Sequence, residues 1–279
     1  MAPARLEDLP AVEAELTYLA PMAGTPRTYT YDPPPAGEPR SNLVDDRRRV
    51  AIHDGRPEAA AFGLDKEGFA LVGQPSAVRD FYDDEEIRRV YYPEAAEFLR
   101  AATGADRVFI YDHTVRRRVP GAADRDNGLR QPATRVHVDQ TVKSGPQRVR
   151  DFFPDEAEAL LRGRVQIVNL WRPIRGPVRD TPLAVCDARS VAPDDLVAQE
   201  LVYPDRTGEI YSVTYRPSHA WVYFPDMRTD EALLLKCYDS AADGRARFAP
   251  HTAFADPTTP ADAPPRESIE IRTLVFHHA

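Results

Sequence analysis

Cysteine and long apolar runs are both scarce in this sequence. Its two cysteines, Cys186 and Cys237, each lie inside an apolar, strand-like segment. Two such residues do not make a disulfide framework, so we expect buried, unpaired thiols. No segment approaches the roughly 18 apolar residues that a membrane helix needs, and residues 1–19 lack the apolar core of a secretion signal. These absences predict a reduced, cytoplasmic protein that does not span a membrane.

Basic blocks are missing as well. The 279 residues include 36 Lys and Arg against 44 Asp and Glu, which gives a formal net charge of −8. The arginine runs at 47–49 and 116–118 are short and have aspartates close by. An acidic chain is repelled by nucleic acid and by anionic lipid, so neither is an expected partner.

Short strand-like runs separated by turn residues are abundant. The 27 prolines disfavour long helices. Many short strands with turns between them are typical of a barrel or jelly roll. We therefore predict a mainly β fold with flanking helices around a jelly-roll, cupin-like core. The clearest strand-like runs are residues 165–171, 182–186, 209–215, 219–224, 232–238 and 268–276.

Helices are expected chiefly before this strand-rich region. Ser76 is placed to begin one helix, and Pro93 to begin another that Gly104 ends. A further helix is expected at residues 154–162, with Pro154 at its start. Residues 113–135 have the composition of a long polar loop.

His137 and Asp139 carry the clearest chemical signal. Residues two apart in a strand point to the same face, so the imidazole and the carboxylate would lie side by side. A later histidine would complete a set of two histidines and one carboxylate. Such a set leaves coordination positions open for substrates and suits non-haem Fe(II).

His251 is the preferred second histidine. Arg266 and Ser268 follow it at a workable distance, whereas none of the nearest arginines downstream of His219 (Arg228, Arg245 and Arg247) has a serine two residues later. His219 opens a strongly apolar strand, which is typical of a packed structural histidine. His113 falls in the predicted polar loop and is a poorer candidate.

The last strand offers residues for a dicarboxylate co-substrate. A guanidinium can grip a carboxylate with two parallel hydrogen bonds, and a neighbouring hydroxyl can add a third. Arg266 and Ser268 are two residues apart in a strand, so the guanidinium and the hydroxyl would lie on the same face. Arg272 on that face is an alternative because it lies deeper in the strand. The alternative is a solvent-facing ladder in which Arg266 pairs with Glu270. Asn169 could line the same cavity, although core packing explains its position better.

These assignments give one domain over residues 1–279. Residues 1–135 would supply an N-terminal arm, helices and supporting strands, with the Pro- and Gly-rich residues 24–40 as an irregular part of the arm. Residues 136–279 would form the metal-binding jelly-roll core.

The chain resembles the CmcJ-like, AsaB-like and fungal gibberellin-desaturase-like group of oxygenases from specialised metabolism. The likeness covers nearly the whole chain, and together its motifs are far more specific than a His-x-Asp alone. The main matching stretches are 136–141 (VHVDQT), 168–173 (VNLWRP), 182–187 (PLAVCD), 219–227 (HAWVYFPDM), 230–233 (DEAL), 238–240 (YDS), 251–257 (HTAFADP) and 266–272 (RESIEIR).

The resemblance implies a double-stranded β-helix, Fe(II), 2-oxoglutarate and O2. It also implies hydroxylation or desaturation of a small natural product while 2-oxoglutarate is decarboxylated to succinate. Gln140 departs from the pattern, since many relatives have an aromatic residue there. Two other functions stay open: a cupin-like metal-dependent dioxygenase that does not use 2-oxoglutarate, and a catalytically silent partner subunit of a biosynthetic complex.

Overall fold

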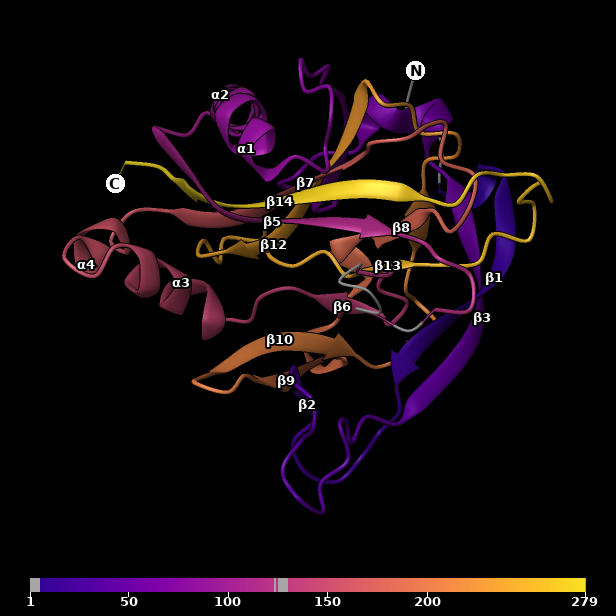
Figure 1. Cartoon of the computed structure of the whole chain (residues 1–279), viewed down its shortest axis with the longest axis horizontal. Helices are drawn as coiled ribbons and strands as arrows, with labels where there is room; N and C mark the ends of the chain where they lie inside the picture. Colours follow the sequence, from indigo (N-terminus) through magenta and orange to yellow (C-terminus); the bar gives the residue numbers. More distant parts are fainter. Residues whose placement is uncertain (1–5, 123, 125–129, 279) are drawn as a thin grey trace.

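Two β-sheets form the body of the protein (Figure 1). The structure, a computed structural model, describes residues 6–122, 124 and 130–278. The smaller sheet has the order β4 (Phe69–Gly73), β12 (Glu231–Asp239), β7 (Val165–Pro173), β14 (Glu267–Phe276) and β5 (Arg107–Arg117). The larger sheet has the order β1 (Ala11–Leu19), β3 (Asp45–Asp54), β11 (Trp221–Tyr223), β8 (Leu183–Cys186), β13 (His251–Ala253), β6 (His137–Val138), β10 (Thr207–Val213), β9 (Leu196–Val202) and β2 (Arg27–Tyr29).

The main core lies between these sheets. Val138 and Val185 of the larger sheet pack in one buried cluster with Ile167 and Leu235 of the smaller sheet. Strands from residues 1–135 and from residues 136–279 take part in both sheets. The two predicted parts of the chain therefore share their sheets.

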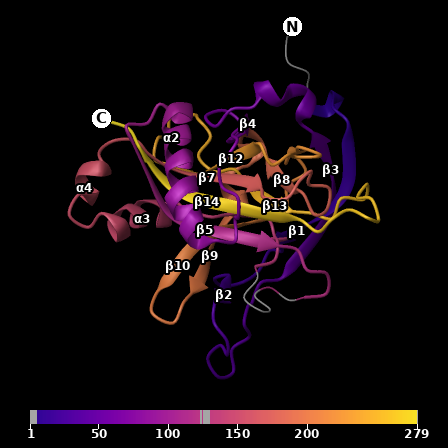
Figure 2. The same cartoon turned by 45° about the horizontal axis from the view of Figure 1, so that its top comes forward.

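The helices cover the outer face and one end of the smaller sheet (Figure 2). Alternate residues of β7 explain the cover: Ile167 faces the core between the sheets, while Leu170 packs with Leu99 of α2. A strand buried on both faces is largely apolar, and β7 is buried along its whole length with only three polar side chains, Gln166, Asn169 and Arg172. The helices are α1 (Asp84–Glu86), which continues through a π turn (Ile87–Tyr91) into α2 (Tyr92–Thr103), and then α3 (Ser144–Phe152) and α4 (Ala157–Leu160).

The helix expected at Ser76 was wrong, because residues 76–83 are not helical and α1 begins at Asp84. Asp83 caps it: Oδ1 accepts the backbone N–H groups of Glu85 at 2.9 Å and Glu86 at 3.2 Å. The hydroxyl of Ser76 instead donates to the carboxylate of Glu94 at 2.6 Å. A serine beside an apolar residue looks like a cap in the sequence, but here it anchors a loop to α2.

The end of α2 was predicted correctly. Gly104 has φ 67° and ψ 24°, the left-handed conformation that a glycine adopts readily after a helix. The helix expected at 154–162 is shorter, since α4 spans only Ala157–Leu160, and α3 was not predicted. The Gly145-Pro146 pair near the start of α3 concealed it, because both residues have low helix propensity.

The polar loop expected at 113–135 was also partly wrong. β5 continues to Arg117 and pairs with β14 along its length, so that Arg116 lies opposite Ser268 and Thr114 opposite Glu270. The strand is polar here because this end lines a cavity instead of the apolar core. Tertiary pairing with β14 overrides the local composition.

The structure also bears on the cysteines and on the membrane helices considered in the sequence. Cys186 and Cys237 are both free and buried, as predicted. Among the helices of the described residues, none has the length and apolar character that crossing a membrane would require.

Candidate metal centre

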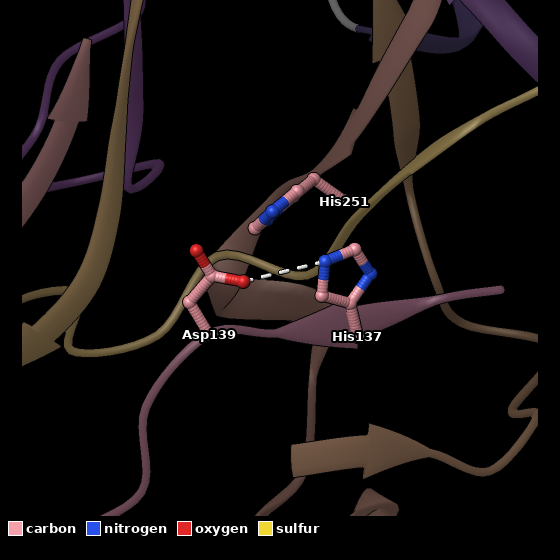
Figure 3. A group of neighbouring side chains, drawn as sticks. All are labelled: His137, Asp139 and His251. Carbon is pink, nitrogen blue, oxygen red and sulfur yellow. Dashed lines mark ion pairs between the residues drawn. The ribbon is translucent and has the colours of Figure 1, made fainter. Parts of the chain in front are cut away.

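His137, Asp139 and His251 converge from two neighbouring strands (Figure 3). β6 pairs antiparallel with β13 so that His137 lies directly opposite His251. The two imidazole centroids are 4.5 Å apart. Asp139 follows β6 directly, and one donor atom from each of the three side chains lies within 4.8 Å of the others. Such a cluster could hold a single metal ion.

Backbone carbonyl groups select the tautomer of both histidines. Nδ1 of His137 donates to the carbonyl of Arg135 at 2.8 Å, and Nδ1 of His251 donates to the carbonyl of Ala249 at 3.1 Å. A carbonyl only accepts, so in the neutral imidazole each Nδ1 carries the proton and each Nε2 has a free lone pair. Metal-binding histidines are commonly oriented in this way.

Asp139 is held by donors on one of its two oxygens. Asn169 Nδ2 donates to Oδ2 at 2.8 Å, and Arg272 Nε donates to the same oxygen at 3.1 Å. Oδ1 instead lies 3.4 Å from Nε2 of His137. The second oxygen is thereby directed at the space between the histidines.

Electrostatics favour a divalent cation at this point. Burial opposes the charge on Asp139, but Arg272 and His137 outweigh it and hold the pKa of Asp139 well below its usual range. Burial and the neighbouring His137 lower the pKa of His251. Burial also acts against the charged form of His137, yet Asp139 raises the pKa of that imidazole. In its charged form His137 carries a second proton on Nε2, which faces Asp139. A metal ion would take the place of that proton.

Arg272 is occupied by acidic partners. Besides Asp139, its guanidinium contacts Glu270 at 3.1 Å and Asp112 at 3.0 Å. Asn169, which the sequence placed with Arg272 in the co-substrate pocket, bridges Asp139 and Glu270, with the second bond at 2.9 Å. Both side chains therefore lie at the carboxylate of the candidate metal centre.

The other two candidate histidines lie elsewhere. His219 packs against Tyr18 with ring centroids 5.7 Å apart, and its Nε2 lies 3.1 Å from Asp195. His113 is on β5, with its Nδ1 2.8 Å from the hydroxyl of Tyr92. Both histidines are parts of local structural networks.

Comparison with known proteins identifies the group to which this site belongs. A family model described as an oxidoreductase/YMDC permease-like domain matches residues 16–276. The hydroxylase/desaturase efuI of Hormonema carpetanum is 37% identical over 249 residues, which are 81% of this chain and 83% of that protein. The Fe(II)/2-oxoglutarate-dependent dioxygenase nvfI of Aspergillus novofumigatus is 33% identical over 273 residues, 95% of this chain and 96% of that protein. This chain belongs to the family of Fe(II)/2-oxoglutarate-dependent dioxygenases.

The fold of this dioxygenase agrees with that membership. A solved structure of the iron and alpha-ketoglutarate-dependent endoperoxidase NvfI superposes with a TM-score of 0.86 and 30% sequence identity, over 96% of this chain and 99% of that chain. The predicted mainly β, jelly-roll fold is confirmed, as are the enzyme class and the use of Fe(II), 2-oxoglutarate and O2. The family favours this class over the cupin-like dioxygenase and the silent subunit.

Arg266 differs from Arg272 because its guanidinium forms no ion pair with an acidic side chain among the described residues. Its side chain is buried, with 3% exposed. Nη1 donates to the carbonyl of Thr181 at 2.7 Å, the guanidinium lies 5.5 Å from the ring centre of Trp171, and Nε has no partner. The hydroxyl of Ser268, two residues further along, also has none. A buried cation and a buried hydroxyl with free hydrogen-bonding capacity fit the carboxylate of a ligand.

A cavity of about 730 Å³ opens beside the candidate metal centre, and His137, Asp139 and Arg272 line it. Neither Arg266 nor Ser268 is among its lining residues. The wall also includes Tyr111 on β5 and Phe152 on α3, as well as residues of β9 and β10. Arg116, which lines the cavity, lies opposite Ser268 on the neighbouring strand, so the cavity adjoins the surroundings of Arg266.

Two arginines of the cavity wall, Arg116 and Arg148, were missed by sequence reasoning. The polar residues Asp112, Thr114 and Arg116 recur every second position, which is the period of a strand. That alternation was the available signal for Arg116. No sequence signal located Arg148, because the helix that carries it was not predicted.

Proposed function

We propose that this dioxygenase holds Fe(II) through Nε2 of His137, Nε2 of His251 and a carboxylate oxygen of Asp139. The observation that carries the proposal is the convergence of two lone-pair nitrogens and an ionised carboxylate within 4.8 Å. Two histidines and one carboxylate are the donor set typical of non-haem Fe(II) oxygenases. Bound Fe(II) supplies O2 activation, with 2-oxoglutarate as the co-substrate that is oxidised to succinate.

We further propose that Arg266 and Ser268 bind the distal carboxylate of 2-oxoglutarate. A buried guanidinium without an acidic partner gains more from an anion than Arg272, which already contacts Asp139, Asp112 and Glu270. Trp171 lies under the guanidinium and restricts its orientation. The pair would fix one end of the co-substrate while its keto-acid end faces the metal.

Asn169 and Arg272 act as positioning residues in this proposal. Both donate to Oδ2 of Asp139, which leaves Oδ1 for the metal. Arg272 also keeps the pKa of Asp139 low, so the carboxylate stays ionised before the metal arrives. Partners of this kind typically change metal affinity by about 10- to 100-fold when they are removed.

The substrate of the proposed reaction is a small natural product that occupies the cavity of about 730 Å³. Sites for small organic ligands commonly measure roughly 300–1,000 Å³. Relatives named as hydroxylase/desaturases support oxidation of a C–H bond as the reaction, by hydroxylation or desaturation. The cavity meets the candidate metal centre at His137 and Asp139. A bound substrate would lie there next to the Fe(II) that would activate O2.

An anaerobic titration tests the metal and co-substrate assignments together. Fe(II) and 2-oxoglutarate, added to the purified protein without O2, are expected to produce a weak visible charge-transfer band at one Fe(II) per chain. Asp139→Ala should abolish the band, and Asp262→Ala in an exposed loop should not change it. A band of full intensity in Asp139→Ala would remove Asp139 from the metal site.

A further inference from the structure

The cavity is positively charged although the chain is acidic. Among the described residues that line it there are seven arginines and three aspartates. The whole chain has a formal net charge of −8. A cleft that concentrates charge of one sign raises the local concentration of ligands of the opposite sign. The excess of arginine is therefore a property of this cavity and not of the protein surface as a whole.

Part of this positive charge is already neutralised. Arg272 pairs with Asp139 and Asp112, and Arg148 lies 3.5 Å from Asp151. Such arginines contribute little further attraction for a ligand. The arginines that matter are those without an acidic partner.

Arg116 is the arginine of this kind on the inner strand β5. Its Nη1 donates to the backbone carbonyl of Gln131 at 2.8 Å, and no ion pair with a carboxylate is formed within the described part of the chain. The side chain is half-buried, and this burial lowers the pKa of Arg116. A partly desolvated guanidinium with unused donors favours an anionic partner.

Arg206 is a second cavity arginine without an acidic partner among the described residues, and it lies at the rim of the cavity. It is exposed, lies on the turn between β9 and β10, and has its guanidinium 4.3 Å from the ring centre of Tyr203. In the described structure it forms no ion pair either. An exposed cation at a cavity rim mainly accelerates and directs the approach of an anion.

The rest of the wall is partly apolar. The ring of Tyr111 stacks on Phe152 with centroids 5.2 Å apart, and Phe152 is 39% exposed although it is aromatic. Leu201 and Ile210 contribute aliphatic surface from β9 and β10. An aromatic or aliphatic body would fit these residues.

We propose that the substrate is an acidic small molecule, with an apolar body and one anionic group that Arg116 binds. The inference rests on the proposed function, because it takes this cavity as the substrate site. A neutral substrate would leave the desolvated Arg116 without a charge partner, whereas a carboxylate or a similar acid would form charge-assisted hydrogen bonds with it. Arg206 guides the acid toward the cavity.

The test compares two fluorescent probes that share their aromatic rings and differ by one sulfonate group. One is 8-anilinonaphthalene-1-sulfonate, and the other is N-phenyl-1-naphthylamine, which has the same rings without the sulfonate. Both are titrated into the metal-free full chain. Arg116→Gln is expected to weaken binding of the sulfonate about tenfold or more, as expected for a hydrogen bond to a charged group. Binding of the neutral probe should change less than about twofold under the same substitution.

Two further variants keep the test decisive. Arg150→Gln removes an arginine of α3 that pairs with Glu158 outside the cavity, and it should affect neither probe. Arg206→Gln should weaken sulfonate binding about two- to threefold, with the effect disappearing at high salt. If Arg116→Gln does not fold, the Arg206→Gln variant decides. The proposal is overturned if Arg206→Gln binds the sulfonate as tightly as the wild type at low salt.

The co-substrate is the competing explanation for the charge. If 2-oxoglutarate displaces the sulfonate probe and Arg116→Gln raises the 2-oxoglutarate requirement, Arg116 serves the co-substrate and the proposal is overturned. Equal loss of both probes in Arg116→Gln would also overturn it. The probes require neither metal nor turnover, so failure here is distinguishable from failure of the charge-transfer titration.

Discussion

The amide of Asn169 donates a hydrogen bond of 2.8 Å to Oδ2 of Asp139. Asn169 lies on β7 of the five-stranded sheet, and Asp139 follows β6 of the nine-stranded sheet. The bond therefore joins the two sheets at the candidate metal centre. It holds the carboxylate with its other oxygen near His137, which is the observation behind the positioning role proposed for Asn169.

Asn169→Ala should weaken metal binding without abolishing it. Arg272 would still hold Oδ2, so the expected loss of affinity is about tenfold, the lower end for a residue that orients a metal ligand. Mn(II) binding, followed by the paramagnetic resonance of the free ion, measures this directly. Asn42→Ala, in an exposed loop, is the control. Unchanged Mn(II) affinity in Asn169→Ala would show that the bond has no role in positioning.

Arg266→Ala should chiefly raise the KM for 2-oxoglutarate. Losing a hydrogen bond between two charged groups costs about 2–3 kcal/mol. This corresponds to a rise in the KM of roughly 30- to 150-fold. Ser268→Ala should raise it about fivefold, as for one neutral hydrogen bond. Succinate release at saturating Fe(II) gives both values, and Arg175→Ala on the exposed surface is the control. A larger effect on metal affinity than on KM would contradict the assignment.

Binding of 2-oxoglutarate should weaken at alkaline pH. Burial, with the nearby charge of Arg116, lowers the pKa of Arg266 to about 9. An anion binds the protonated guanidinium, so affinity is constant below this pKa and falls as pH rises through it, by up to about tenfold per pH unit. Tryptophan fluorescence can report binding, since Trp171 lies beside Arg266. Arg266→Gln should bind weakly at every pH, and a wild-type curve that stays flat to pH 10 would contradict the prediction.

Neither thiol should react in the native protein. Burial raises the pKa of Cys186 to about 12, and burial with the nearby Asp139 raises the pKa of Cys237 well above its usual value. At pH 8 the thiolate fraction of Cys186 is then only about one in ten thousand. A chromogenic disulfide reagent is expected to label no thiol in the native chain and both thiols in denaturant. Rapid labelling of the native protein would contradict the prediction, because it would require β8 or β12, which carry the two cysteines, to open.

Local patterns were sufficient for much of the site. The spacing of His137 and Asp139 put both side chains on one side of the chain, because neighbouring Cβ directions follow from backbone geometry alone. The choice of His251 over His219 depended on the residues that follow each of them, and the structure brings His251 to the cluster. The run at 165–171 likewise predicted a strand, and the structure has β7 there at Val165–Pro173.

The roles of Arg266 and Arg272 could not be separated in this way. Both lie on one face of the last strand, and each has the right chemistry for a carboxylate. Which arginine retains an unused charge depends on the acids that other strands bring close, such as Asp112 from β5. Arg116 was misplaced for the same reason. The sequence indicated a strand only at 107–111, and the polar continuation of β5 to Arg117 pairs with β14.

The sequence by itself determined the strand-rich core, the family and the candidate donor residues, because residue type and short-range spacing are read directly from the chain. Only the tertiary structure decided which charges neutralise one another and which face the cavity unpaired. Those outcomes depend on strand register and burial between segments more than a hundred residues apart, and the position of a residue in the sequence does not specify them.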